Sequence, residues 1–274
     1  GSVVSKATDA EFGVHRWTLS NGIKVIMKPT DFKDDEILFA AFSPGGHSLV
    51  ADDLFIPASS AANAMLESGA GSFSRIQLDK RLAGKALHVS PYINELQEGL
   101  RGSCSPDDIE TFMQLIYLRF TGGRADPEAF SALLTRKRAE LANRLADPGA
   151  VFRDRITETM SQHHLRRKPW TPETVDLMDL DASLDVFRER FADANGFTFT
   201  FTGNLDLKQM EVLIGQYLAS LPVLESAETW KDSKICRPTG DVTLSVDRGI
   251  DNKAKVVMLF WGPFTWNYGK RFRL

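Results

Sequence analysis

A strictly alternating run of aromatic and polar residues, Phe197–Phe201 (FTFTF), constrains the fold more than any other segment. Successive side chains of a β-strand point to opposite faces of a sheet, so the three phenylalanines lie on one face and the threonines on the other. No basic residues surround the run, so we interpret the rings as core side chains rather than a platform that stacks nucleic-acid bases. The run therefore predicts a strand with one buried aromatic face.

Further strand signals come early in the chain. His15–Leu19 and Lys24–Lys28 are β-prone runs joined by Ser20-Asn21-Gly22, and Asn-Gly is a strong hairpin signal because both residues tolerate positive φ. Glu36–Phe42 is largely apolar, which predicts a strand covered on both faces. Two more strands are expected around the turn at Asn94-Glu95, over Ala86–Ile93 and Gln97–Cys104.

Helical signals fill most of the chain between these strands. Proline or an acidic residue stands at several expected helix starts, and Gly69 follows the end of the first helix. Apolar residues recur at three and four residues along the later helices, as in a helix with one buried stripe. The expected helices cover Pro57–Ser68, Ser72–Ala83, Ser105–Phe120, Asp126–Leu145, Ala150–His163, Ala182–Phe191 and Leu207–Leu221.

These elements predict an α+β fold, in which a mainly antiparallel sheet packs against a group of helices. We expect one complete domain over residues 15–222. Residues 223–240 are polar, contain two prolines and lack periodicity, which is typical of a linker. Residues 241–274 then contain two expected strands, Val242–Val246 and Lys255–Trp261, which we interpret as the first strands of a next domain. Their open edges would be free to pair with a second copy of the chain.

Composition excludes several classes of function. The 274 residues carry a net charge of -3, which gives no electrostatic footprint for nucleic acid. No apolar run approaches the roughly 20 residues that cross a bilayer. Gly1-Ser2 is typical of a cloning remnant, so we expect the natural protein to extend beyond it, with room for a leader. Cys104 and Cys236 are too few and too distant for a disulfide framework.

The order of the elements resembles the homologous domain of the pitrilysin/insulinase family of zinc metallopeptidases. Four segments carry the resemblance through the domain, and a fifth resembles an early strand of the succeeding domain. They are Thr18–Phe32 (TLSNGIKVIMKPTDF), Ala41–Leu49 (AFSPGGHSL), Ser90–Phe120, Phe197–Pro222 and Lys255–Phe264 (KVVMLFWGPF). The resemblance covers nearly all of residues 15–274 and is greatest to the C-terminal half of bacterial four-domain zinc proteases.

Active members of that family carry H-x-x-E-H on the first helix. Two imidazoles four residues apart share one helical face and one zinc ion, the glutamate between them is the base, and a distant glutamate completes the ligand set. Aligned on Met65-Leu66 and Gly69, the motif falls on Ser60, Asn63 and Ala64. Alanine has no donor atom and asparagine is no base at neutral pH, so we expect no catalytic residue and no metal in this chain.

Two remnants of the family's site are identifiable through the resemblance. Glu140 falls near the position of the distal zinc ligand, but a single carboxylate holds no zinc, so we interpret it as a solvated helix residue. The strand Ala86, Leu87, His88, Val89, Ser90 resembles the edge strand that receives substrate as an added strand. Pro91 removes one donor there and weakens the prediction of peptide binding.

The resemblance implies a structural, substrate-enclosing domain of a zinc metalloendopeptidase. Zinc and peptide-bond hydrolysis would belong to the catalytic N-terminal half of the same polypeptide, which with the peptide substrate would be this domain's partner. We expect a periplasmic or other extracytoplasmic location. The alternative is a non-enzymatic scaffold subunit resembling the core-type or processing-peptidase proteins. A self-standing hydrolase that uses Glu140 or His88 is the third hypothesis.

Overall fold

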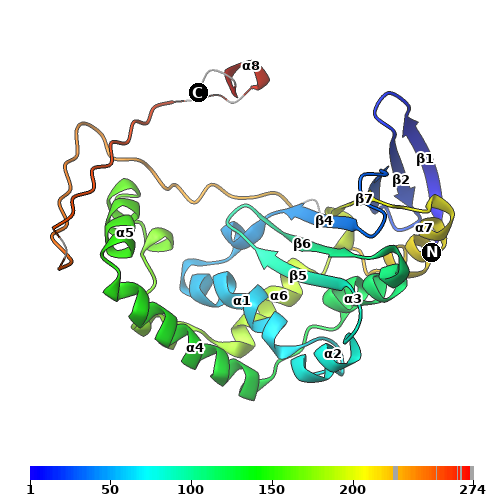
Figure 1. Cartoon of the computed structure of the whole chain (residues 1–274), viewed down its shortest axis with the longest axis horizontal. Coiled ribbons are helices and arrows are strands. Elements are labelled where there is room, and N and C mark those ends of the chain that lie inside the picture. The colour runs from blue at the N-terminus through cyan, green and yellow to red at the C-terminus, as the bar shows by residue number, and fades with distance from the viewer. Residues whose placement is uncertain (225–227, 251, 264, 266, 272–274) are drawn as a thin grey trace. The chain divides into compact units, whose positions relative to one another are not determined.

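A computed structural model describes residues 1–224, 228–250, 252–263, 265 and 267–271. One seven-stranded sheet has the order β1-β2-β3-β7-β4-β6-β5 (Figure 1). Its strands are β1 (Val3–Asp9), β2 (Val14–Leu19), β3 (Lys24–Pro29), β4 (Ile37–Pro44), β5 (Leu87–Ile93), β6 (Gln97–Cys104) and β7 (Thr198–Gly203). All neighbours pair antiparallel except β3 and β7. The predicted α+β class with a mainly antiparallel sheet is confirmed.

Helices α1, α3 and α6 lie on one side of this sheet (Figure 1). The helices are α1 (Phe55–Ser68), α2 (Arg75–Arg81), α3 (Ile109–Thr121), α4 (Pro127–Ala146), α5 (Pro148–Met160), α6 (Leu180–Arg190), α7 (Leu207–Leu213) and α8 (Tyr268–Arg271). A π-helical turn at Ile214–Leu218 continues α7. The expected helices are present, and their ends differ by a few residues. For example, α2 begins at Arg75 because Ser74 and Gln77 form a capping box there.

Strand β7 is the alternating run, and it lies in the middle of the sheet. It pairs parallel with β3 and antiparallel with β4, so Phe201 stands between Met27 and Phe39. Phe199 and Phe201 are fully buried, whereas the threonines between them are only partly buried. The single buried aromatic face predicted from the sequence is confirmed.

Aromatic rings join this face to the helices. The ring of Phe39 on β4 lies 5.3 Å from Phe112 of α3 in an edge-to-face contact, and 4.9 Å from Phe201. Phe120 of α3 lies 4.9 Å from Phe197, just before β7. Edge-to-face pairs of this kind add to the stabilisation that burial alone provides. The core of the domain is therefore a layer of phenylalanines between the sheet and the helices.

The expectation that the strand at Glu36–Phe42 is covered on both faces is wrong. Burial alternates strictly along β4, and Leu38 and Phe42 are 51% and 45% exposed. The sequence misleads here because apolar side chains occupy both faces of the strand. The helices cover only the face of Phe39, so the opposite face of the sheet keeps an apolar surface.

Strand β1 was not predicted. Its sequence, VVSKATD, has no apolar alternation, and five of its seven residues are exposed. Its order comes from backbone pairing with β2, from Asp9 opposite Val14 to Val3 opposite Leu19. A strand stabilised mainly by its ladder leaves little trace in side-chain pattern.

The chain divides into two compact units, which we describe separately. The first comprises Gly1–Ala142 and Trp170–Ser233, and contains the sheet. The second comprises Asn143–Pro169 and the described part of residues 234–274. In the first unit, part of the predicted linker is docked: Arg190 pairs with Glu228 at 2.8 Å, and the Lys231 N–H donates to Ser48 Oγ at 2.9 Å.

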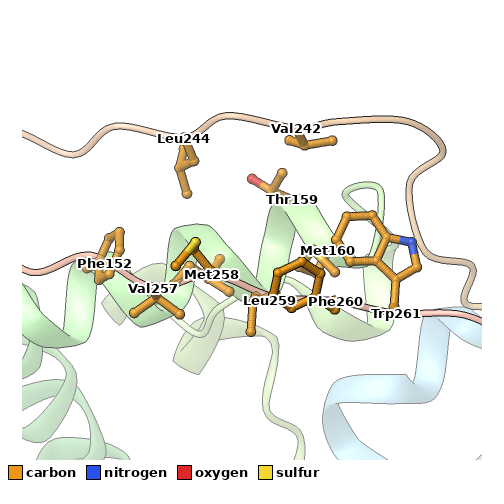
Figure 2. Close-up of a pocket in the computed structure, with 11 residues that line it drawn as sticks. Phe152, Thr159, Met160, Val242, Leu244, Val257, Met258, Leu259, Phe260 and Trp261 are labelled. Atoms are coloured by element: carbon orange, nitrogen blue, oxygen red, sulfur yellow. The ribbon is translucent and has the colours of Figure 1, made fainter.

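The two strands expected after the linker are not formed. Val242–Val246 and Lys255–Trp261 are extended but have no ladder with any described residue. Residues of both segments instead line, together with residues of α5, a pocket of about 260 Å³ (Figure 2). A strand needs a partner for its backbone groups, and alternation in sequence does not supply one. The boundaries 15–222, 223–240 and 241–274 stay predictions, and Phe264 lies outside the described residues.

Among the described residues, no helix is both long enough and apolar enough to cross a membrane.

Truncating a side chain on the buried face of β4 should destabilise the domain much more than truncating one on the open face. We expect Phe39→Ala to lower the free energy of unfolding by about 3–5 kcal/mol, since it leaves a cavity among buried rings. Phe42→Ala, on the same strand, should lower it by about 1 kcal/mol or less. Urea unfolding followed by circular dichroism measures both values. Equal losses would contradict the one-sided core.

Candidate functional site

The first helix, α1, is the element that carries the degenerate motif, and small residues fit it closely into the domain. Ala58, Ala61 and Ala64 are each at most 1% exposed. Ser183 of α6 is fully buried and its hydroxyl donates to the Pro57 carbonyl, 3.1 Å away. Side chains this small let the backbones of two helices approach closely. The helix is therefore fixed by packing, without any bound group.

Two arginines hold the end of α1. The Arg119 guanidinium donates to the Gly69 carbonyl at 3.0 Å, and Arg124 Nε donates to the Ser68 carbonyl at 3.0 Å. Cations are favourable at this end of a helix, where carbonyls lack intrahelical partners. Burial, with a contribution from nearby Arg75, lowers the pKa of Arg119 to about 10. Gly69, with φ 103°, ends the helix as the sequence predicted.

The motif positions contain no metal ligand set. Ser60 is buried, and its hydroxyl donates to the Ile56 carbonyl at 2.9 Å, within the same helix. Ala64 is 1% exposed and Asn63 is exposed. The two ligand positions thus share one buried face, as their spacing requires. That face is filled by packing, and the Ser60 hydroxyl on it donates to the backbone of its own helix, so these residues offer no ligand set for a zinc ion.

Glu140 lies on α4 and pairs with Lys137 at 3.0 Å, with its side chain 58% exposed. One turn earlier, Arg136 of α4 pairs with Glu67 of α1 at 3.1 Å. The structure thus brings α4 beside the last turns of α1, as a distal-ligand position requires, but gives Glu140 the environment of a solvated helix residue. The role of Glu140 as a remnant stays a prediction.

Other candidate chemical groups are dispersed. No group of three or more His, Cys, Asp or Glu side chains among the described residues could hold a metal ion. His88 on β5 lies 3.3 Å from the Ser103 hydroxyl, and His163 follows the end of α5 beside Glu158. Cys104 is buried, and this burial raises the pKa of its thiol to about 12, so it is no nucleophile. Cys236 is exposed and unbridged.

Two buried ionisable side chains, Glu98 and Arg190, are not indicated by the sequence pattern. Glu98 on β6 is 2% exposed and accepts a hydrogen bond from the Gly46 N–H at 2.5 Å. Arg190 on α6 is 3% exposed, and its positive charge favours the ionised form of the Glu98 carboxyl. Burial raises the pKa of Glu98, although Gly46, Arg190 and Ser43 act in the opposite sense. No local pattern marks these residues, because they are 92 positions apart and only the fold brings them together.

Strand β5 is an edge strand, as the resemblance implied. The Asn94 N–H, just after β5, donates to the Gln97 carbonyl, so even-numbered positions direct their backbone groups towards β6. The outward positions are then Leu87, Val89, Pro91 and Ile93. No strand of the described chain pairs with this edge. Pro91 is thus at an outward position, and the donor it lacks is one that an added strand would use.

The face of the sheet opposite the helices is a second open surface. The partly buried threonines of β7 lie in register with Leu38, Ala40 and Phe42 of β4. In the neighbouring strands, Arg101 lies over the ring of Tyr92, 4.8 Å from its centroid. The surface therefore offers apolar, hydroxyl and aromatic groups side by side. We call it the open sheet face.

Comparison with known proteins shows which sequences and folds this chain is similar to. No family model matches the chain. Two curated relatives are "Zinc protease PQQL-like" of Arabidopsis thaliana, 29% identical over 223 residues, and "Probable zinc protease PqqL" of Escherichia coli, 25% identical over 225 residues. The matches cover 81% and 80% of this chain, but only 21% and 23% of those proteins. The chain thus spans about a fifth of the relatives that it matches.

Solved structures share the fold. The periplasmic protease PqqL from Escherichia coli matches with a TM-score of 0.72 and 23% identity, over 86% of this chain and 26% of that protein. The first half of the same protease gives 0.64 and 17% identity, over 83% and 50%. A peptidase M16 inactive domain from Pseudomonas fluorescens gives 0.62 and 15% identity, over 80% and 54%. The chain therefore shares the fold of M16 (pitrilysin-type) peptidase domains, and its sequence is similar to those of zinc proteases, in agreement with the resemblance.

Restoring the motif tests whether the ligand positions are closed. We expect Ser60→His/Asn63→Glu/Ala64→His to bind no stoichiometric zinc, as measured by elemental analysis after dialysis. Ala64→His alone should lower the free energy of unfolding by about 1–3 kcal/mol, because it overpacks a buried site. Asn63→Glu, on the exposed side, is the matched control and should change it by about 0.5 kcal/mol or less. A triple variant with native stability and one tightly bound zinc would contradict the closed site.

The raised pKa of Glu98 predicts a pH dependence of stability. A carboxyl whose folded pKa lies above its unfolded value near 4.5 stabilises the fold when protonated, and this contribution is lost as pH rises through the folded pKa. The free energy of unfolding of the wild type, relative to Glu98→Gln, should therefore fall as the pH rises above the unfolded pKa near 4.5. Urea titrations at increasing pH measure the difference. A difference that grows with pH would show that the carboxylate is the favoured form.

Proposed function

We propose that this chain is a non-catalytic, substrate-enclosing domain of a zinc metalloendopeptidase, placed in the C-terminal half of the parent polypeptide. Two observations support the placement. The whole Escherichia coli protease matches with a higher TM-score than its first half, 0.72 against 0.64, which favours a counterpart in its other half. The motif helix of this chain also has no ligands at Ser60 and Ala64, which suits a domain whose partner half holds the metal.

The open sheet face is the observation that carries the substrate-enclosing role. The uncovered face of this sheet carries half-exposed Leu38 and Phe42, where polar side chains would be expected on a solvated face. Apolar and aromatic side chains beside threonine hydroxyls suit contact with unfolded peptide, which presents both apolar side chains and unpaired backbone groups. The outward positions of β5 add a backbone edge to the same sheet, at which an extended peptide could form one further strand.

In this proposal the chemistry belongs to the partner half of the parent polypeptide. A zinc ion held there would activate the water that hydrolyses the peptide bond. The residues of this chain bind and orient peptide, and limit its escape. One relative is described as a periplasmic protease, which supports an extracytoplasmic location for the parent of this chain.

Substitutions on the open sheet face test the proposal in the parent polypeptide. We expect Leu38→Glu/Phe42→Glu to lower kcat/KM for β-casein, a long unfolded substrate, by about tenfold, through KM. Cleavage of a short fluorogenic peptide that is confined to the zinc site should be unchanged. Ile76→Glu, 68% exposed on α2, is the matched control and should leave both activities unchanged.

Two outcomes would contradict the proposal. Unchanged casein cleavage by the double variant would exclude substrate contact at this face. A parent polypeptide that lacks any intact H-x-x-E-H and cleaves neither substrate would favour the scaffold alternative.

A further inference from the structure

A groove of about 430 Å³ lies between α2 and α3, on the side of the domain away from the open sheet face. Its position follows from α3, whose Phe112 packs on Phe39, on the helix-covered face of the sheet. The floor is apolar and is made of two leucines from α2 and its C-terminal end and two from α3. These are Leu78, Leu82, Leu115 and Leu118. We call it the α2–α3 groove.

The groove is positively charged. Arg81, the last residue of α2, and Lys85, in the turn that follows it, line the groove, and no acidic side chain does. The Lys85 ammonium is 2.9 Å from a carboxylate oxygen of Asp108, so its charge is already compensated. Arg81 lies over the Phe73 ring, 5.6 Å from its centroid, and has no carboxylate partner in the described part of the chain. Arg81 is therefore a cation held beside an apolar floor, and is available to an anionic group.

The dimensions of the groove fit two turns of a helix. Along α3 it extends from Thr111 to Leu118, and seven residues at a rise of about 1.5 Å each span about 10 Å. This length seats apolar side chains at i and i+4 of a bound helix, which are about 6 Å apart. The groove is open to solvent along one side. A small ligand would stay partly exposed there, whereas a helix needs to bury only one face.

We propose that the α2–α3 groove binds an acidic amphipathic helix of a protein partner. Apolar side chains at i and i+4 of that helix lie on the leucine floor, and a glutamate or aspartate one turn away pairs with Arg81. A guanidinium forms two parallel hydrogen bonds to a carboxylate, which gives such a contact both strength and orientation. This surface is independent of the proposed function, because it lies on the other side of the domain from the open sheet face.

A fluorescent alanine-based helical peptide with leucine at i and i+4 and glutamate one turn away is the probe. A peptide with lysine in place of the glutamate is its control. Fluorescence anisotropy with the whole chain should show binding of the acidic peptide, weakened about tenfold by Arg81→Glu. Lys80→Glu changes a neighbouring exposed cation that does not line the groove, and should weaken binding about twofold or less at physiological salt. Arg81→Glu should in turn favour the lysine peptide.

Circular dichroism melting checks that each variant folds, and Arg81→Gln replaces Arg81→Glu if the charge reversal unfolds the chain. Equal weakening by Arg81→Glu and Lys80→Glu would show non-specific attraction and overturn the proposal. Absence of acidic-peptide binding would overturn it as well. Binding of dodecanoate that depends on Arg81, with no binding of the peptide, would assign the groove to a small anionic amphiphile instead.

Discussion

The insertion of β7 between β3 and β4 is the interaction on which the rest of the domain depends. It joins the N-terminal hairpin to the β4–β6–β5 section, and it pairs with residues more than 150 positions away in the chain. Its register also decides which face of the whole sheet is aromatic, because a slip of one residue would turn Phe199 and Phe201 to the other face. The helices then have only one face to cover. Both the core and the open sheet face follow from this single placement.

In the first helix, structural contacts occupy the positions on which the family's zinc motif is predicted to fall. In α1 the two positions that would hold zinc still point inwards, but Ser60 is bonded to its own helix and Ala64 is packed. The helix is positioned by close contact with α6 and by Arg119 and Arg124 at its end. None of these interactions needs a metal.

The two uncovered surfaces of the domain differ in chemistry and lie on opposite sides. The open sheet face combines apolar side chains with threonine hydroxyls and an unpaired strand edge, which suits extended peptide. The α2–α3 groove has a leucine floor and one uncompensated cation, which suits a folded acidic segment. Because the two surfaces use different residues, the domain could bind a partner at each of them at the same time.

The amino-acid sequence was enough to predict the elements whose side chains alternate or recur. Examples are β7, the Asn-Gly hairpin and α1, on which the family's zinc-ligand positions are predicted to hold serine and alanine. The sequence did not reveal β1, which is ordered by backbone pairing and has no side-chain pattern. The sequence also led us to expect that both faces of β4 are buried and that two strands follow the linker. Both expectations are wrong, because apolar residues do not show which partner, if any, covers a segment. These features depend on tertiary contacts. The same contacts place Arg190 where it acts electrostatically on Glu98, and place Arg81 in one groove with the leucines of α3. Local pattern records the preference of each segment, whereas burial and charge pairing depend on neighbours that are distant in the chain.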